Sequence, residues 1–272
     1  MNRRPNFVAG MLAAVWLAII AAPLYAVTVT AARPASEYIT SGPLGSPTDL
    51  TFENFKIVLD GGFSHYVFNT TFVALVTVLI VLALAVPVSY FVVRGRGAMA
   101  TQTFRLFLVG LAIPAQAVII PVYLLINKMG LYDSYWAIIL PTAAFSLPVS
   151  VLVLTTGMRE VPGELYEAMA LDGASTTRAF YLLAVPLSRG SIMTVTVFTA
   201  LNAWNGFLFP LILTQSEDVR VVTLGLYDFI GQYSSNIPAL LAAVLLSAVP
   251  ILALYLVARK ALVRGLAGTG GK

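Results

Sequence analysis

Long uncharged stretches, separated by short charged segments, organise the whole chain. Six of them exceed 18 residues, and they contain 28, 33, 22, 25, 27 and 30 residues. Because crossing the hydrocarbon core of a bilayer takes about 20 helical residues, each stretch is long enough to cross once. Backbone groups in hydrocarbon must be paired within the protein, which leaves helices and closed barrels. The stretches lack the alternation of barrel strands, so the pattern predicts an all-α polytopic membrane protein with six transmembrane helices.

The predicted spans define the organisation of the chain. They lie near residues 7–31, 67–93, 104–126, 136–157, 192–213 and 237–258. The segments between them are too short to form a separate catalytic domain. We therefore expect one membrane domain over residues 1–272, with a long loop at 158–190 and a basic tail at 259–272. The first stretch is longer than the apolar part of a signal peptide, about 7–15 residues, so we expect it to be retained as a helix.

Positive charges are divided unevenly between the two sides that six spans create. Of the 16 Lys and Arg residues, twelve fall on the side of the two termini and four on the opposite side. Cytoplasmic segments of membrane proteins carry an excess of Lys and Arg. The sequence therefore predicts that both termini and the loop 158–190 are cytoplasmic.

Composition excludes several classes of protein. Hydrophobic residues make up 59% of the chain and charged residues 10%, against roughly 25% charged residues in soluble domains. This excludes a water-soluble globule and a disordered chain. The net charge of +4 follows from membrane orientation, so we expect no nucleic-acid partner. With no cysteine and one histidine, and with no paired carboxylates or Ser/His set at one membrane depth, we expect no catalytic residue and no metal site.

The loop 158–190 carries the most specific local signals. Pro162 suits the first turn of a helix, where its missing N–H costs nothing. Asp172 and Gly173 form a stop and turn signal, and glycine permits a left-handed backbone. Ser175 can cap a second short helix. The pattern predicts a helix, a tight turn and a second helix at the membrane surface.

The spacing in this loop resembles the cytoplasmic signature of the permease subunits of bacterial ABC importers. That signature begins with Glu-Ala-Ala, followed after three residues by Gly. After nine more residues come two aliphatic residues with one residue between them, and then Pro. The matching residues are Glu167, Ala168, Met169, Gly173, Leu183, Val185 and Pro186. Every spacing agrees, and Met169 replaces the second Ala, which we expect to make the contact surface bulkier.

The resemblance implies that this segment is a coupling helix, which docks on an ATPase subunit. Glu167 would be the charged anchor, Ala168 and Ala170 the close-packing surface, and Gly173 the turn. The expected coupling residues are Glu167, Ala168, Met169, Ala170, Asp172 and Gly173. ATP and Mg²⁺ would be bound by that ATPase and not by this chain, whose terminal Gly-Thr-Gly-Gly-Lys lacks the phosphate-loop pattern. We expect no cofactor here and no enzymatic activity of the chain itself.

The resemblance extends to a branch of the family. Four segments look like the maltose-type carbohydrate permeases, namely residues 113–154, 172–175, 204–213 and 263–272. Within that group, the chain is similar to the shorter, six-span subunit. This implies half of a translocation pathway for a sugar or oligosaccharide in a bacterial cell membrane. The expected partners are a second permease subunit in a heterodimer, an ABC ATPase dimer, an external solute-binding protein and membrane lipid. Gly206 stands where members usually have an acidic residue, and a non-sugar solute such as glycerol phosphate is the alternative.

Polar residues within the fifth predicted span are the candidate substrate pathway. Asn202 and Asn205 are three residues apart and would share one face of a continuous helix, with Trp204 and Phe207 beside them. Amides and aromatic rings suit hydroxyl-rich ligands, whereas hydrogen bonds to another span are the structural alternative. Similar residues near other spans, Asn69, Thr70, Thr71 and Gln116, are interpreted as structural. No charged residue is expected at mid-bilayer, which disfavours a proton-coupled carrier. A stand-alone channel or secondary carrier is the weaker alternative.

Overall fold

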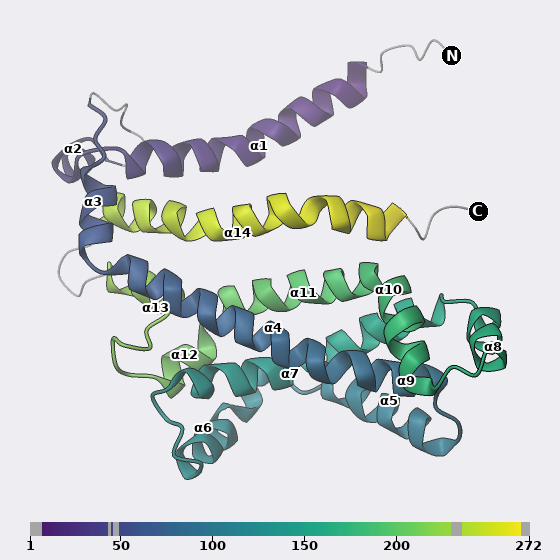
Figure 1. Cartoon of the computed structure of the whole chain (residues 1–272). Coiled ribbons are helices and arrows are strands. Elements are labelled where there is room, and N and C mark those ends of the chain that lie inside the picture. Colours follow the sequence, from purple (N-terminus) through teal and green to yellow (C-terminus); the bar gives the residue numbers. More distant parts are fainter. Residues whose placement is uncertain (1–6, 43–44, 46–48, 230–235, 268–272) are drawn as a thin grey trace. The chain divides into compact units, whose positions relative to one another are not determined.

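A computed structural model describes residues 7–42, 45, 49–229 and 236–267, and all regular structure in these residues is helical (Figure 1). This confirms the all-α expectation for the described part of the chain. The glycine-rich end of the predicted tail, residues 268–272, lies outside it. The chain divides into two compact units, residues 1–65 with 225–249 and residues 66–224 with 250–272. The expectation of one membrane domain stays a prediction.

The helices follow one another with short connections. Those that lie in or begin in the first unit are α1 (Phe7–Ala31), α2 (Ala35–Ser41), α3 (Glu53–Asp60), α4 (Phe63–Arg94) and α14 (Ile237–Ala267). The others are α5 (Ala98–Gly110), η1 (Ala115–Val118), α6 (Ile119–Lys128), α7 (Tyr135–Arg159), α8 (Gly163–Leu171), α9 (Thr176–Ala179), η2 (Phe180–Ala184), α10 (Val185–Leu187), α11 (Arg189–Trp204), α12 (Leu208–Leu213) and α13 (Val222–Asp228).

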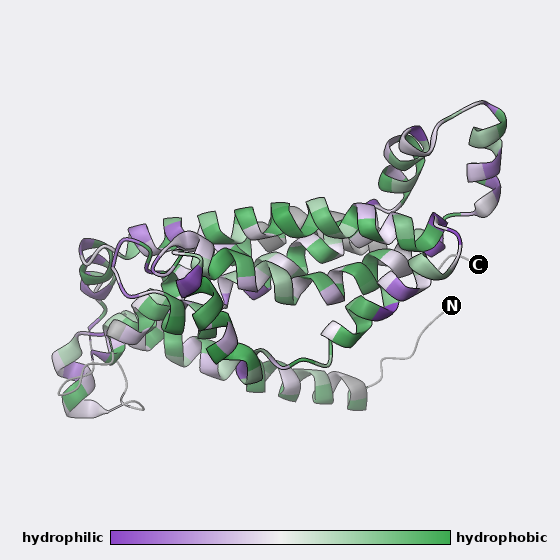
Figure 2. Cartoon of the chain, turned by 90° about the horizontal axis from the view of Figure 1, so that it is seen from below, coloured by the Kyte–Doolittle hydropathy of each residue, from purple (hydrophilic) through white to green (hydrophobic). Residues whose placement is uncertain are grey.

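Three described helices are each long and apolar enough to cross a membrane. They are α1, α4 and α7, and they coincide with the predicted spans at 7–31, 67–93 and 136–157. Two pairs of consecutive helices, bent by 89° and 72° at the break between them, meet the same test when each pair is taken as one span. Counting both pairs raises the number of candidate spans to five. Within α14, residues Ile237–Ala253 form a shorter apolar helix where the sixth span was predicted. Hydrophobic residues run along the long helices and hydrophilic residues gather near helix ends (Figure 2).

The third predicted span, 104–126, is wrong as a single straight helix. Helix α5 ends at Gly110, and α6 continues only after a break and the short 3₁₀ helix η1. Pro114 lies in the break with an extended ψ of 131°. Because proline has no N–H and disfavours a helical residue before it, the hydrogen-bond ladder cannot pass through this position. The two halves meet at 89°.

The core of the second unit is formed by apolar faces of α4, α7 and α11. Its buried residues are Val81, Ala85, Val86, Ala143, Val151, Leu154, Met158 and Val195. Gly157 lets α7 and α11 approach closely, since a Cβ at this position would lie 1.8 Å from Ser191 Oγ. Small residues at such contacts are typical of packed membrane helices.

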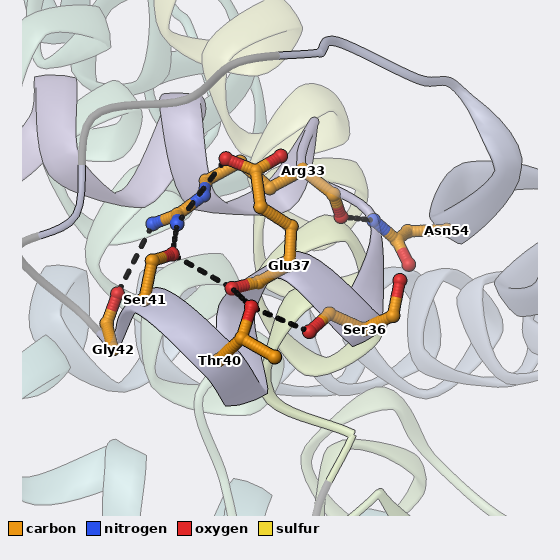
Figure 3. A network of polar contacts seen from close by, with 7 residues as sticks. All are labelled: Arg33, Ser36, Glu37, Thr40, Ser41, Gly42 and Asn54. Carbon is orange, nitrogen blue, oxygen red and sulfur yellow. Dashed lines mark hydrogen bonds and ion pairs between the residues drawn. The ribbon is translucent and has the colours of Figure 1, made fainter.

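The turn that follows α1 is fixed by a buried cation (Figure 3). Arg33, 1% exposed, donates to Ser41 Oγ and to the Gly42 carbonyl at 3.2 Å, and it lies 3.6 Å from the Glu37 carboxylate. The Asn54 amide donates to the Arg33 carbonyl at 2.7 Å. A buried charge is tolerated when it is paired and hydrogen-bonded, so this network ties α1, α2 and α3 together within the first unit.

Two side chains anchor the connection that follows α12 to the second unit. Asn69, fully buried, donates to the Asp218 and Arg220 carbonyls at 2.9 and 2.8 Å and accepts from the Tyr135 hydroxyl at 2.8 Å. The Val222 N–H donates to the Thr70 hydroxyl at 2.9 Å. The structural interpretation of Asn69 and Thr70 is thereby confirmed.

A third anchor on the same connection is Asp133, whose Oδ1 accepts from the N–H groups of Gln215 and Ser216 at 2.8 and 2.9 Å and from the Ser216 hydroxyl at 3.1 Å. These bonds, the Gln215 N–H first, lower the pKa of Asp133. Hydrogen bonds to the ionised form have this effect on a carboxyl group.

The contact between α7 and α11 predicts a strict limit on side-chain size. In Gly157→Ala the new Cβ would lie 2.7 Å from Ser191 Cβ, and overpacking of this kind costs about 1–3 kcal/mol. We expect a lower Tm for the purified protein in detergent. Gly163→Ala in α8 is the matched control, because its Cβ would meet nothing within 4 Å. Equal Tm values for the two variants would contradict the close contact.

The lowered pKa of Asp133 predicts an acid sensitivity. The folded pKa lies below the unfolded value, so its stabilisation is complete above about pH 4 and is lost as pH falls through the folded pKa. We expect Asp133→Asn to lower the Tm at neutral pH and to flatten the decline in Tm below about pH 4. Asp60→Asn, at an exposed acid in α3, is the control. A wild-type slope in Asp133→Asn would argue against this contribution.

Candidate functional site

Helix α8, which carries the predicted coupling residues, begins and ends as its local sequence dictates. Pro162 precedes it as the N-cap, with an extended ψ of 132°, one position earlier than expected. Glu164 lies in the first turn, where a negative charge is favoured by the helix dipole. Gly173 takes the left-handed conformation with φ of 73°. The Gly173 N–H donates to the Ala170 carbonyl and the Ala174 N–H to the Met169 carbonyl, the paired bonds of a Schellman ending.

The second helix of the loop also forms where the sequence predicts it. The Ser175 hydroxyl accepts from the Arg178 N–H at 3.2 Å and caps α9. Helix α9 continues through the π-helical η2 into α10. Pro186 in α10 has no N–H to extend an α-helical ladder, and a π turn accommodates such a gap. The chain then bends by 72° into α11.

Tyr166 fastens α8 to the end of α4. It is 6% exposed and forms a buried cluster with Ala179 and Ala184. The Arg94 guanidinium lies 4.2 Å from the centre of its ring, within the range of a cation–π contact. The Tyr90 ring lies 6.4 Å away. Burial raises the pKa of Tyr166, Tyr90 adds to the rise and Arg94 opposes it, so the phenol is neutral.

The opposite face of α8 is open. Glu167 and Ala168 are exposed on this face, and Asp172 and Gly173 are exposed at the helix end. Ala170 is exposed as well, but it lies four residues after Tyr166 and lines a cavity together with Tyr166 and Arg94. Helix α8 lies at one end of the second unit (Figure 1).

Met169 does not share this open face. Its side chain is partly buried and packs against the Tyr166 cluster, so the expectation that it makes the contact surface bulkier does not hold. Its thioether fills space beneath the helix instead. Five of the six predicted coupling residues therefore lie on the accessible surface.

Sequence reasoning missed the most exposed apolar side chain of α8. Leu171 is 90% exposed beside Gly173. An apolar residue in the last turn, next to a glycine ending, was the available signal, but helical periodicity alone did not separate it from buried leucines. Tyr166 and Arg94 were also missed, because their contact joins residues far apart in sequence.

The candidate pathway residues lie where the fifth predicted span breaks. Helix α11 ends at Trp204 and α12 begins only at Leu208, so a continuous helix over 192–213 is wrong. Asn205 closes α11, and its side-chain amide donates to the Leu201 carbonyl at 2.8 Å. Asn202 is exposed and bonds no other side chain or carbonyl of the described residues. Neither asparagine therefore links two spans within the described chain.

The aromatic residues at this break differ in exposure. Trp204 is 8% exposed and Phe207 is 40% exposed. Between them, the Gly206 carbonyl accepts from the Thr223 hydroxyl at 2.7 Å. A Cβ at Gly206 would lie 3.3 Å from the Ala203 carbonyl oxygen, so a larger residue here would strain the turn. Broken helices at membrane depth occur where the backbone is enclosed by protein or lines a water-filled cavity.

The described residues contain no group of three or more His, Cys, Asp or Glu side chains that could hold a metal ion.

The Tyr166 anchor predicts how α8 opens. Tyr166→Ala removes a buried aromatic ring, a change that costs about 3–5 kcal/mol, and we expect local detachment of α8 without loss of the helical core. Trypsin cleavage after Arg178, followed by mass spectrometry, should become much faster. Tyr181→Ala is the control, since Tyr181 is 64% exposed in the same loop. Similar cleavage rates in the two variants would refute the anchor.

Comparison with known proteins gives a family match over most of the chain. The family described as "Binding-protein-dependent transport system inner membrane component" matches residues 85–267. The putative ABC transporter permease protein ORF2 of Caldicellulosiruptor sp. (strain Rt8B.4) is 35% identical over 93% of this chain and 92% of its own length. The diacetylchitobiose uptake system permease protein NgcG of Streptomyces coelicolor is 29% identical over 94% of this chain and 85% of its own length.

A solved structure shares the fold. It is a chain of a bacterial ABC transporter involved in the import of the acidic polysaccharide alginate. The TM-score is 0.77 at 20% sequence identity, covering 96% of this chain and 98% of the other. This confirms the expected permease fold.

Proposed function

The chain belongs to the family of inner membrane components of binding-protein-dependent transport systems, and we propose that it forms half of the translocation pathway of an ATP-driven sugar importer. It is a multi-pass membrane protein. The second half would come from another permease subunit in a heterodimer, and the solute from an external binding protein. The observation that carries the proposal is α8, an accessible helix with the signature spacing, fastened to a membrane-spanning helix.

Helix α8 has the properties that a coupling helix needs. Its open face carries one anionic anchor, Glu167, one small residue that permits close approach, Ala168, and the apolar Leu171 at its end. Interfaces of this kind gain most of their energy from a few buried anchors. An ATPase dimer that binds and hydrolyses ATP would move α8, and Tyr166 would pass this motion to α4. In this proposal the chain itself binds neither ATP nor Mg²⁺ and catalyses no reaction.

The proposed orientation places α8 in the cytoplasm of a bacterial cell. Twelve of the 16 Lys and Arg residues fall on the side of the two termini and the loop 158–190, in agreement with the positive-inside bias. Docking on a cytoplasmic ATPase requires this same side, so charge distribution and coupling chemistry point the same way.

Sugar as the solute is supported by two observations. NgcG, a relative, is named for diacetylchitobiose uptake. In this chain, Asn202 and Phe207 are exposed at the break between α11 and α12, and exposed amide and aromatic groups suit hydroxyl-rich ligands.

Two substitutions on the open face test the coupling. Glu167→Ala removes the anionic anchor, and Leu171→Ala removes an apolar contact worth about 1.5–3 kcal/mol when fully buried. Each should reduce co-purification of the ATPase and abolish or strongly reduce solute uptake, while membrane insertion stays normal. Uptake is measured in cells and ATPase recovery by gentle solubilisation.

Glu164→Ala is the matched control, because Glu164 is exposed in the first turn of the same helix. Normal uptake and full ATPase recovery in both test variants would contradict the proposal.

A further inference from the structure

A cavity of about 160 Å³ lies between the end of α4 and the α8–α9 turn. Its wall consists of three alanines, Thr176 and the polar side chains Tyr90, Arg94 and Tyr166. No carboxylate is among these lining residues. The volume corresponds to about five waters in the liquid, enough for one tetrahedral oxyanion.

Two side chains of the cavity wall carry hydrogen-bond donors that other groups do not occupy. The Tyr166 hydroxyl is buried and has no hydrogen-bond partner among the described residues, although a buried hydroxyl normally has one. The Arg94 guanidinium stacks on the Tyr166 ring and forms no ion pair with a described carboxylate. Stacking uses the face of the guanidinium and leaves its edge, where all five N–H groups lie, free to bind an anion.

The other wall groups hold the cavity in place. The Tyr90 hydroxyl donates to the Thr176 carbonyl at 3.3 Å, and the Tyr90 ring packs against Phe180 at 5.1 Å between centres. These two contacts join the α4 side of the cavity to α9 and η2.

The position of Arg94 sets the depth of the cavity in the membrane. Helix α4 has 32 residues and is about 48 Å long at 1.5 Å per residue. The hydrocarbon core is about 30 Å thick and the whole bilayer about 40–45 Å. The ends of α4 therefore reach the headgroup layers, and Arg94 is its last residue. Lipid phosphates occupy this layer, and basic pockets beside membrane helices bind them.

We propose that this cavity is a phosphate site, in which the Arg94 guanidinium and the Tyr166 hydroxyl donate to the oxygens of one phosphate group. The group is carried by the headgroup of an anionic phospholipid or by free phosphate. Its binding would bridge α4 and α8. The inference goes beyond the proposed function. Its test uses the chain without an ATPase, so the two can fail independently.

The test is thermal unfolding of the full-length protein in detergent. Inorganic phosphate and short-chain phosphatidylglycerol are titrated separately, each against chloride at equal ionic strength. A ligand that binds only the folded state raises the Tm in a saturable manner, and we expect this in the wild-type protein. Arg94→Gln should weaken the apparent affinity by about tenfold or more, since a charge-assisted bond is lost. Tyr166→Phe, which keeps the ring, should weaken it by about threefold to tenfold.

Matched controls separate this site from general charge effects. Arg96→Gln removes an exposed cation two residues away, and Tyr181→Phe removes an exposed hydroxyl in the same loop. Both should keep the wild-type affinity. A response to phosphatidylglycerol alone identifies the headgroup as the source, and a response to phosphate alone identifies the free anion. No saturable response to either probe, or equal responses in all variants, would overturn the proposal.

Discussion

The packing of Tyr166 against the end of α4 is the contact on which the rest of the loop depends. Helix α8 has nine residues, and isolated helices shorter than about 12–15 residues are marginal in water. Its open face gives it no support, so the buried ring, the Arg94 guanidinium and the Met169 side chain hold it. A helix held at one side and free at the other can receive a partner and pass its displacement to a membrane-spanning helix.

A second constraint governs the membrane-spanning part, where every backbone group must find a partner. The structure meets it with specific compensations at the break after α11. The Asn205 amide bonds the Leu201 carbonyl within its own helix, and Thr223 donates to the Gly206 carbonyl. The break leaves Asn202 and Phe207 exposed. A side-chain hydrogen bond to another long helix, the structural alternative for Asn202 and Asn205, is formed by Asn69 and by neither of these two.

Features with local causes could be predicted from the sequence. Apolar length located α1, α4 and α7, and the glycine and serine signals located the ends of α8 and α9. The breaks at Pro114 and Gly206 could not be located, because proline and glycine are common in membrane helices that stay continuous. The Tyr166–Arg94 contact was also out of reach, since it joins α8 to a residue of α4 that no sequence pattern connects to it. The inward direction of Met169 follows from the same contact.

Cross-linking from α8 tests the central claim most directly. The chain has no cysteine, so Leu171→Cys gives this chain a single thiol for a photoreactive maleimide, and cross-linking is then followed in the assembled transporter. Tyr181→Cys, at an exposed position in the same loop, is the comparison. A strong adduct between position 171 and the ATPase subunit, with little from position 181, is the predicted result. Labelling of position 171 from outside intact cells, or an adduct with no ATPase, would contradict the coupling role of α8.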